Sequence, residues 1–308
     1  MTKKRAVTFK PYIKTRYAYE KLRVCRHCHH FTVLWEDKCN LCGKSTLVSI
    51  RQRVTATVKR TMLNERLIAL FIGLVGVYFG ETFLQMILSA AAAILLIALL
   101  WFVQRRMLPF EVPSEMEKLF EQEQPRIIED IKRNRKLAVA ALKDDELLTY
   151  EMLREIATFV QNDKIRLQQV VLLQSFVLRK DMDLAIEPLL IDSFDTDLAA
   201  YIGEVAKVQR ELIKNSSIRY ILAYEPHILE MENGAEILSS VAAAAIRLKK
   251  YVEAYPEFIR RYARNIPKDR FLRLYRMIQQ HPESYWGKLA EEVSQIRREQ
   301  YEWDSDFQ

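Results

Sequence analysis

Glycine is scarce in this sequence. Seven of the 308 residues are glycine, about a third of the ~7% found in average proteins. Folds with many tight turns, such as propellers and sandwiches, are therefore poor candidates, and so are glycine-rich phosphate-binding loops. Catalytic signatures are missing too, because the chain contains no HExxH, no GxSxG and no Glu-x-x-His pair. The hydrophobic content of 50% is too high for a disordered chain.

Acidic residues are rare in the first 66 positions, where 16 Lys and Arg stand against four Asp and Glu. Residues 67–104 carry one charge, and the rest of the chain has 31 basic and 35 acidic residues. A basic arm over residues 1–19 would be attracted to anionic lipid headgroups or to nucleic acid, and charge alone does not separate these partners. The residues expected to make such contacts are Lys14, Arg16, Lys21 and Arg23.

One long apolar run extends from Leu67 to Gln104 and is interrupted only by Glu81. Residues 82–104 form an uncharged helix of ~34 Å, enough to cross a hydrocarbon core of ~30 Å. The stretch from Leu67 to Gly80 is shorter, and it crosses the membrane only if Met62 and Leu63 extend it. We therefore predict a two-helix transmembrane hairpin over residues 62–104, with helices at about 62–80 and 83–104 and membrane lipids as partners.

Small residues lie where the two predicted helices would meet, and they allow close approach in lipid. They are Gly73, Gly76 and Gly80 on the first helix, with Ala93 and Ala98 on the second. The alternative is a buried core hairpin of a soluble protein, which such a long uncharged run rarely forms.

The flanks of the hairpin predict its orientation. Lys and Arg precede and follow it, whereas its loop has none, so the positive-inside rule assigns both termini to the cytoplasm. Residues 1–60 contain no apolar stretch typical of a signal peptide. We expect an integral protein with two spans, in a bacterial cell membrane.

All four cysteines fall in one short window with the pattern C-x2-C-x10-C-x2-C: Cys25, Cys28, Cys39 and Cys42. Four thiolates complete a closed tetrahedral site with no open position, which indicates one structural zinc ion per chain. Iron also suits four sulfur ligands, and two disulfides are disfavoured in a reducing compartment. Three nearby histidines, His27, His29 and His30, are alternative ligands but are expected on the surface.

This module resembles a zinc ribbon of the rubredoxin-like kind over about residues 20–55, and we assign residues 20–60 to it. The resemblance implies a small β structure that supports nucleic-acid binding, protein docking or local stability. Alternating residues predict strands around Phe31 to Trp35 and from Thr46 to Val54. The glycine usual after the second cysteine is replaced by His29.

The rest of the chain reads as helical. Residues 107–113 predict a linker, and Ser114-x-x-Glu117 is typical of a capping box at a helix start. Residues 114–308 are expected to form a cytosolic all-α domain of about nine helices, as a bundle or short α-solenoid, around an alanine-rich segment from Val241 to Ile246. The predicted fold class is mainly α, with a small β zinc ribbon and a transmembrane hairpin.

The leading functional hypothesis is a non-enzymatic, membrane-anchored cytosolic adaptor that binds a protein partner. One alternative is a membrane-tethered nucleic-acid-binding protein that uses the cysteine module and the basic arm. Another is an assembly factor or enzyme with an unrecognised site in the helical domain. Acidic pairs such as Asp181 and Asp183 are expected to cap helices, with a second metal site as the alternative.

Overall fold

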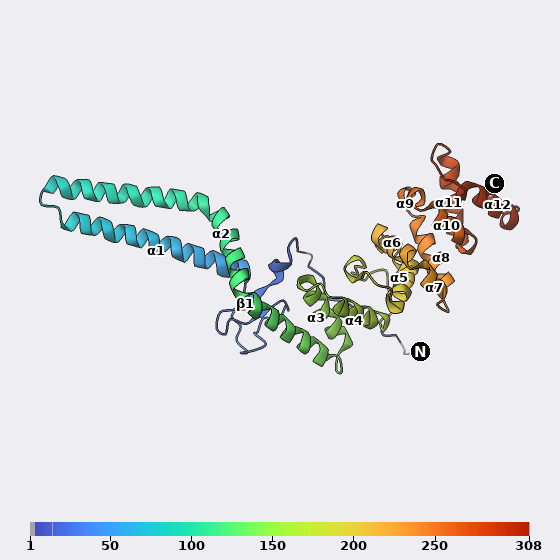
Figure 1. Cartoon of the computed structure of the whole chain (residues 1–308), viewed down its shortest axis with the longest axis horizontal. Coiled ribbons are helices and arrows are strands. Elements are labelled where there is room, and N and C mark those ends of the chain that lie inside the picture. The colour runs from blue at the N-terminus through green and yellow to red at the C-terminus, as the bar shows by residue number, and fades with distance from the viewer. Residues whose placement is uncertain (1–3, 14, 308) are drawn as a thin grey trace. The chain divides into compact units, whose positions relative to one another are not determined.

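The structure, a computed structural model, describes residues 4–13 and 15–307 (Figure 1). They divide into two compact units. One comprises residues 15–140, and the other combines residues 4–13 with residues 141–307. This division differs from the predicted domains, because residues 114–140 belong with the cysteine module and the basic arm is divided between the units.

A small sheet opens the first unit. After the 3-10 helix η1 (Ala18–Lys21) come β1 (Arg23–Cys25), β2 (Phe31–Thr32) and β3 (Leu47–Ser49). The strand order is β2-β1-β3 and both pairings are antiparallel. The residues from Phe31 to Leu34 are all buried rather than alternating, since both faces of this segment are covered.

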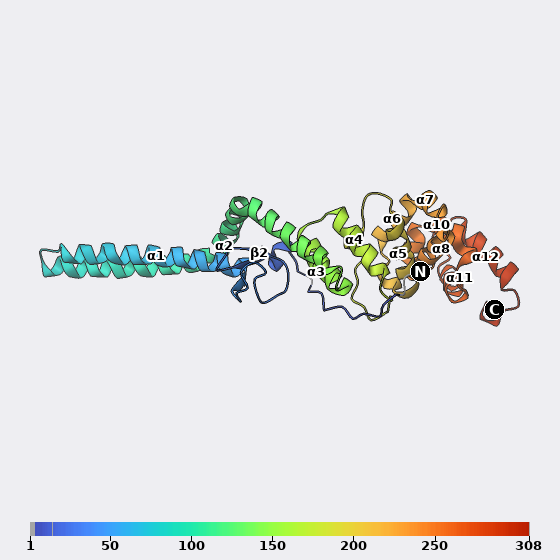
Figure 2. The same cartoon turned by 90° about the horizontal axis from the view of Figure 1, so that it is seen from below.

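Two long helices follow the sheet: α1 (Ile50–Tyr78) and α2 (Phe83–Ala141). Ser49 caps α1, because its side-chain oxygen accepts the N–H of Gln52 at 3.2 Å. The strand predicted up to Val54 therefore ends at Ser49, and residues 50–60 are helical instead of part of the cysteine module. Both views show α1 and the first half of α2 running side by side (Figures 1 and 2).

The linker predicted over residues 107–113 is wrong, because α2 continues through it without a break. An apolar cluster explains the difference. Val54, Val58 and Met62 of α1 are buried against residues of α2 at helical spacing: Leu108, Val112, Met116 and Leu119. Burial of this face stabilises the helix more than local sequence preference opposes it. Ser114 lies inside α2 and does not cap it.

Three prolines lie within α2: Pro109, Pro113 and Pro125. Each lacks the N–H that would bond to the preceding turn, so an interior proline kinks a helix. The ribbon of α2 accordingly changes direction in its middle part (Figure 1). The bend turns the last part of α2, from about Pro125, toward the small sheet of the same unit.

Both helices contain stretches long and apolar enough to cross a membrane. None of the most apolar window of α2 and only 11% of that of α1 is buried. Large exposed side chains, including Phe71, Leu95 and Trp101, cover both stretches. In the described residues these stretches are therefore not covered by the rest of the chain, as the alternative of a core hairpin would require.

The second unit is helical. Its elements are α3 (Glu146–Phe159), α4 (Asp163–Gln174), η2 (Glu187–Leu189), α5 (Thr196–Val208), η3 (Arg210–Leu212), α6 (Asn215–Ala223), α7 (Glu225–Leu229), α8 (Gly234–Ala245), α9 (Lys249–Ala254), α10 (Pro256–Tyr262), η4 (Ala263–Asn265), α11 (Lys268–Gln280), α12 (Leu289–Gln300) and η5 (Ser305–Phe307). The described residues of this unit thus form ten α-helices, and about nine were expected over residues 114–308, which also include the end of α2. Helix α8 is central, with Val241 to Ile246 buried between α5, α7 and α10.

The start of the chain packs on this helical unit. Arg5 forms a parallel bridge with Phe176, and its backbone N–H donates to the carbonyl of Ser175 at 2.9 Å. Lys4 pairs with Glu204 at 2.6 Å, and Lys10 pairs with the buried Glu151 at 3.3 Å. This part of the basic arm is thus engaged with carboxylates of its own chain.

Candidate metal centre

Two matching turns present the cysteines. In the first turn the N–H of His29 donates to the carbonyl of Cys25 at 3.0 Å, and in the second the N–H of Gly43 donates to the carbonyl of Cys39 at 2.8 Å. Both donors have left-handed backbones, with φ of 57° at His29 and 71° at Gly43. This conformation suits glycine and strains a histidine. His29 therefore adopts the turn geometry of the glycine that it replaces.

The four sulfur atoms gather at one point. Every pair of them lies within 4.8 Å, with 3.6 Å between the Sγ atoms of Cys25 and Cys42 and 3.5 Å between those of Cys28 and Cys39. Four metal–sulfur bonds of ~2.3 Å in a tetrahedron place the sulfurs ~3.8 Å apart. The cluster is therefore able to hold one metal ion with four thiolates.

The surroundings shift the pKa values of three of the thiols in different directions. Burial raises the pKa of Cys25, but hydrogen bonds from the Thr46 hydroxyl and from backbone amides outweigh it and lower that pKa to about 5. Burial raises the pKa of Cys28 to about 12 and also raises that of Cys39. Cys25 therefore loses its proton readily, whereas Cys28 and Cys39 resist a second negative charge beside it. A bound metal cation would compensate these charges and take the place of the remaining protons.

The histidines are not part of the cluster, which among the described residues consists of the four cysteines. His27 is exposed and its Nε2 lies 3.0 Å from Nζ of Lys44. His30, expected on the surface, is buried instead. Its Nδ1 lies 2.9 Å from Oδ1 of Asp130 on α2, so its side chain serves the contact with that helix.

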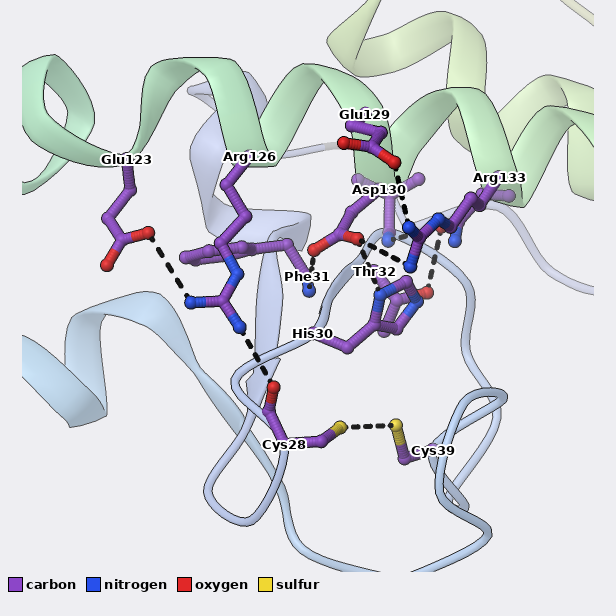
Figure 3. A network of polar contacts seen from close by, with 12 residues as sticks. Cys28, His30, Phe31, Thr32, Cys39, Glu123, Arg126, Glu129, Asp130 and Arg133 are labelled. Atoms are coloured by element: carbon purple, nitrogen blue, oxygen red, sulfur yellow. Dashed lines mark hydrogen bonds and ion pairs between the residues drawn. The ribbon is translucent and has the colours of Figure 1, made fainter.

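The last part of α2 holds the cysteine module through polar side chains (Figure 3). The carboxylate of Asp130 accepts the backbone N–H of Phe31 at 2.9 Å. One turn later, Oδ1 of Asn134 accepts the hydroxyl of Thr32 at 2.9 Å and the backbone N–H of Val33 at 3.2 Å. A strand edge that would otherwise expose unpaired amides is thereby satisfied by a helix.

Arg126 completes this contact from the same face of α2. Its guanidinium donates to the carbonyl of Cys28 at 2.9 Å, directly beside the sulfur cluster (Figure 3). The sequence patterns did not predict this contact between the helix and the module. The sequence does contain a sign of this contact. Asp130 and Asn134 interrupt an otherwise apolar, buried helix face, and buried polar side chains need hydrogen-bond partners; the apolar members of that face are Ile127, Ile131 and Ala138.

The predicted lipid- or nucleic-acid-contacting residues differ in their surroundings. Arg23 donates to the carbonyls of Trp35 and Glu36, at 3.4 and 3.1 Å, and so ties a loop of the module. Arg16 lies over the ring of Tyr17 at 5.3 Å and lines a cavity of about 600 Å³ together with Arg51. Lys21 lies in η1. Lys14 falls outside the described residues.

The small residues of the hairpin also differ among themselves. A Cβ added at Gly73 would overlap that of Ala93, whereas one at Gly76 would meet Ser89 at an ordinary 3.7 Å. Gly80 lies close to Met86 at the loop. Ala98 is exposed and does not face α1, because a five-residue step from position 93 turns about 140° around a helix.

A polar contact closes the base of the apolar stretches, and sequence reasoning missed it. Gln104 is buried, and its Oε1 accepts Nε of Arg66 at 2.6 Å. Its Nε2 donates to the carboxylate of Glu65 at 2.7 Å and to the carbonyl of Met62 at 3.3 Å. These bonds fix the register of α1 against α2 at this level.

Comparison with known proteins found no similarity: no family model, no curated protein and no solved structure matches the chain. Within the described part of the chain, the four-cysteine cluster has the spacing that holds a metal ion.

Proposed function

We propose that this protein is a non-enzymatic, membrane-anchored adaptor. In this proposal α1 and α2 cross the membrane as a hairpin, the four cysteines hold a structural zinc ion in a ribbon-like module, and the helical unit binds a protein partner. Both termini lie in the cytosol.

One observation carries the proposal: the helix that leaves the apolar hairpin is the same helix that holds the cysteine module. Asp130 and Asn134 lie on α2, beyond its apolar stretch, and accept backbone N–H groups of the module. A rigid connection between a membrane segment and a closed metal module holds the module at a fixed position, which suits a scaffold more than a catalyst. An adaptor needs such placement to present a binding surface at a defined distance from the bilayer.

The donor set supports zinc in a structural role. Four sulfur ligands leave no position for a water or a substrate, which distinguishes structural zinc sites from catalytic ones. Cys25 and Cys39 are buried, and Arg126 reinforces the turn at Cys28. A bound ion would stabilise strands that are only two or three residues long.

The side chains at the base of the hairpin support a membrane boundary there. Arg105 lies over the ring of Trp101 at 5.5 Å and Arg106 over that of Phe102 at 4.8 Å. Aromatic rings with neighbouring cations are typical of the headgroup level. The positive flanks on both helices favour a cytosolic location for the two ends.

Membrane fractionation tests the anchor. The full chain, expressed at low level, is expected to float with vesicles and to resist extraction by alkaline carbonate. Reporters fused to either terminus are expected to read cytosolic, and purified protein to contain one zinc ion per chain. Carbonate-extractable protein, or termini on opposite sides, would exclude the two-span anchor; iron in place of zinc would change only the metal.

A second candidate is a membrane-tethered nucleic-acid-binding protein, favoured by the cavity beside η1. There Tyr17 stacks on Tyr19 with ring centroids 5.3 Å apart, next to Arg16 and Arg51. Stacked aromatics beside cations are a sequence-tolerant way to bind single strands. This candidate predicts binding of a labelled oligonucleotide that weakens steeply with salt and is lost in Tyr17→Ala.

A further inference from the structure

A basic groove crosses the helical unit at the start of α9 and along α11. Its volume is about 550 Å³. Five cationic side chains line it: Arg247, Lys249, Arg270, Arg273 and Arg276. Among the described lining residues the one carboxylate, that of Asp269, pairs with Arg270 at 3.2 Å. Lys249 lies 3.5 Å from Glu253 and 3.7 Å from Glu283, outside the lining. The groove therefore concentrates positive charge on a segment, residues 141–308, that carries 28 acidic and 23 basic residues.

Three of these arginines have no carboxylate partner among the described residues. Arg273 donates to the backbone carbonyl of Arg247 at 2.7 Å, and Arg276 donates to that of Asp306 at 3.5 Å. Nε of Arg247 is buried without a hydrogen-bond acceptor. A guanidinium group that donates only to backbone carbonyls, or to no acceptor, is not neutralised by a carboxylate. Its positive charge is therefore available to a ligand.

Two arginines elsewhere in the same unit pair with carboxylates. Arg261 pairs with Glu225 at 2.6 Å, and Arg264 pairs with Glu292 and Glu299 at 3.1 and 2.7 Å. Along α11, by contrast, Arg273 and Arg276 have no carboxylate partner among the described residues, and like charges at that three-residue spacing oppose the helix. An external anion would relieve this repulsion.

We propose that the groove docks a short acidic peptide segment of a protein partner. Leu248, Leu272 and Met277 lie in the lining between the cations, so an apolar side chain fits beside the carboxylates. The lining contains no Phe, Tyr or Trp on which bases could stack, and the acidic excess of the surrounding unit repels a long polyanion. A segment of a few residues, confined to the groove, escapes that repulsion.

This inference rests on the proposed adaptor role and states the chemistry of its partner. The test uses the full chain in detergent and fluorescence anisotropy of three labelled probes. They are a nonapeptide of three Glu-Glu-Leu repeats, its Lys-Lys-Leu counterpart and a single-stranded oligonucleotide. We expect only the acidic peptide to bind, with an affinity that falls about tenfold or more between ~50 and ~300 mM KCl as screening increases.

The groove variant is Arg273→Glu/Arg276→Glu, and the matched control, Arg219→Glu/Arg298→Glu, changes the same charge at exposed positions outside the groove. The groove variant is expected to lose at least about tenfold in peptide affinity and the control less than about twofold. Arg273→Gln/Arg276→Gln, which reverses no charge, should show an intermediate loss. Circular dichroism checks that each variant is folded.

Three results overturn the proposal: no binding of the acidic peptide, equal losses in groove and control variants, or groove-dependent binding of the oligonucleotide that is tighter than that of the peptide. Vesicle flotation of the same variants separates the two proposals. A chain that floats but does not bind the peptide refutes the groove alone, and a chain that binds but does not float refutes the anchor alone.

Discussion

The carboxylate of Asp130 accepts the backbone N–H of Phe31 at 2.9 Å, across 99 residues of sequence. The same carboxylate lies 2.9 Å from the ring nitrogen of the buried His30. Residue 31 follows the first cysteine pair, and residue 130 follows the apolar stretch of α2. The contact therefore joins the metal module to the helix that continues from the hairpin.

Removal of this carboxylate should loosen the module. In Asp130→Ala, the N–H of Phe31 and the ring of His30 lose a buried partner, which is expected to cost about 2–4 kcal/mol. Zinc release to a chelator, which requires local opening, should then be at least about tenfold faster than in the wild type. Glu129→Ala is the control, because Glu129 is exposed on the same turn. Equal release rates in the two variants would contradict the contact.

The metal site should depend on the cysteines and not on the histidine beside them. Cys28→Ser is expected to lower bound zinc from about one ion per chain to a small fraction of that, because a closed four-sulfur site loses a ligand. His27→Ala should retain the metal, since His27 is exposed and paired with Lys44. Elemental analysis of purified protein measures both. Zinc lost from the histidine variant would revise the ligand set.

The two glycines of α1 should respond differently to the same methyl group. Gly73→Ala places a Cβ on that of Ala93 and should push the helices apart, at a cost of about 1–3 kcal/mol. Gly76→Ala meets Ser89 at 3.7 Å and should be neutral or slightly stabilising, because alanine favours helices. Thermal unfolding in detergent compares them. A lower midpoint for Gly76→Ala than for Gly73→Ala would refute this packing.

Alkaline pH should weaken the helical unit through Tyr220. Burial raises the pKa of Tyr220 from 10.0 to about 12. Between these values the unfolded tyrosine loses its proton while the folded one keeps it, so the stability present below pH 10 falls as pH rises. The loss from this group is at most about 2.7 kcal/mol.

Tyr220→Phe removes that contribution. The phenol also accepts the backbone N–H of Asp195 at 3.0 Å, so the variant should be less stable at neutral pH by about 1 kcal/mol. As pH rises from 10 to 12, the free energies of unfolding of the two proteins should first converge and then, if the full loss occurs, cross. Denaturant titration at several pH values measures this, and parallel curves would show that the Tyr220 phenol titrates alike in both states.

The sequence was informative where chemistry depends on spacing. The pair spacing of Cys25, Cys28, Cys39 and Cys42 predicted one cluster, because two residues between cysteines suffice to turn the chain back on itself. The length of the apolar run likewise predicted helices able to cross a membrane, and the buried alanines of α8 were recognisable from their continuous apolar character. These features are local, so each could be read from a short window.

Long-range contacts decided the rest. Residues 107–113 are helical because Leu108 and Val112 pack against α1, which no local rule for Pro109 or Pro113 anticipates. Asp130, Asn134 and His30 acquire their roles only when α2 bends back onto the sheet. Spacing alone determined which groups can share an ion or span a bilayer. Which buried donors find acceptors depends on segments about a hundred residues apart, and only the packed chain brings these together.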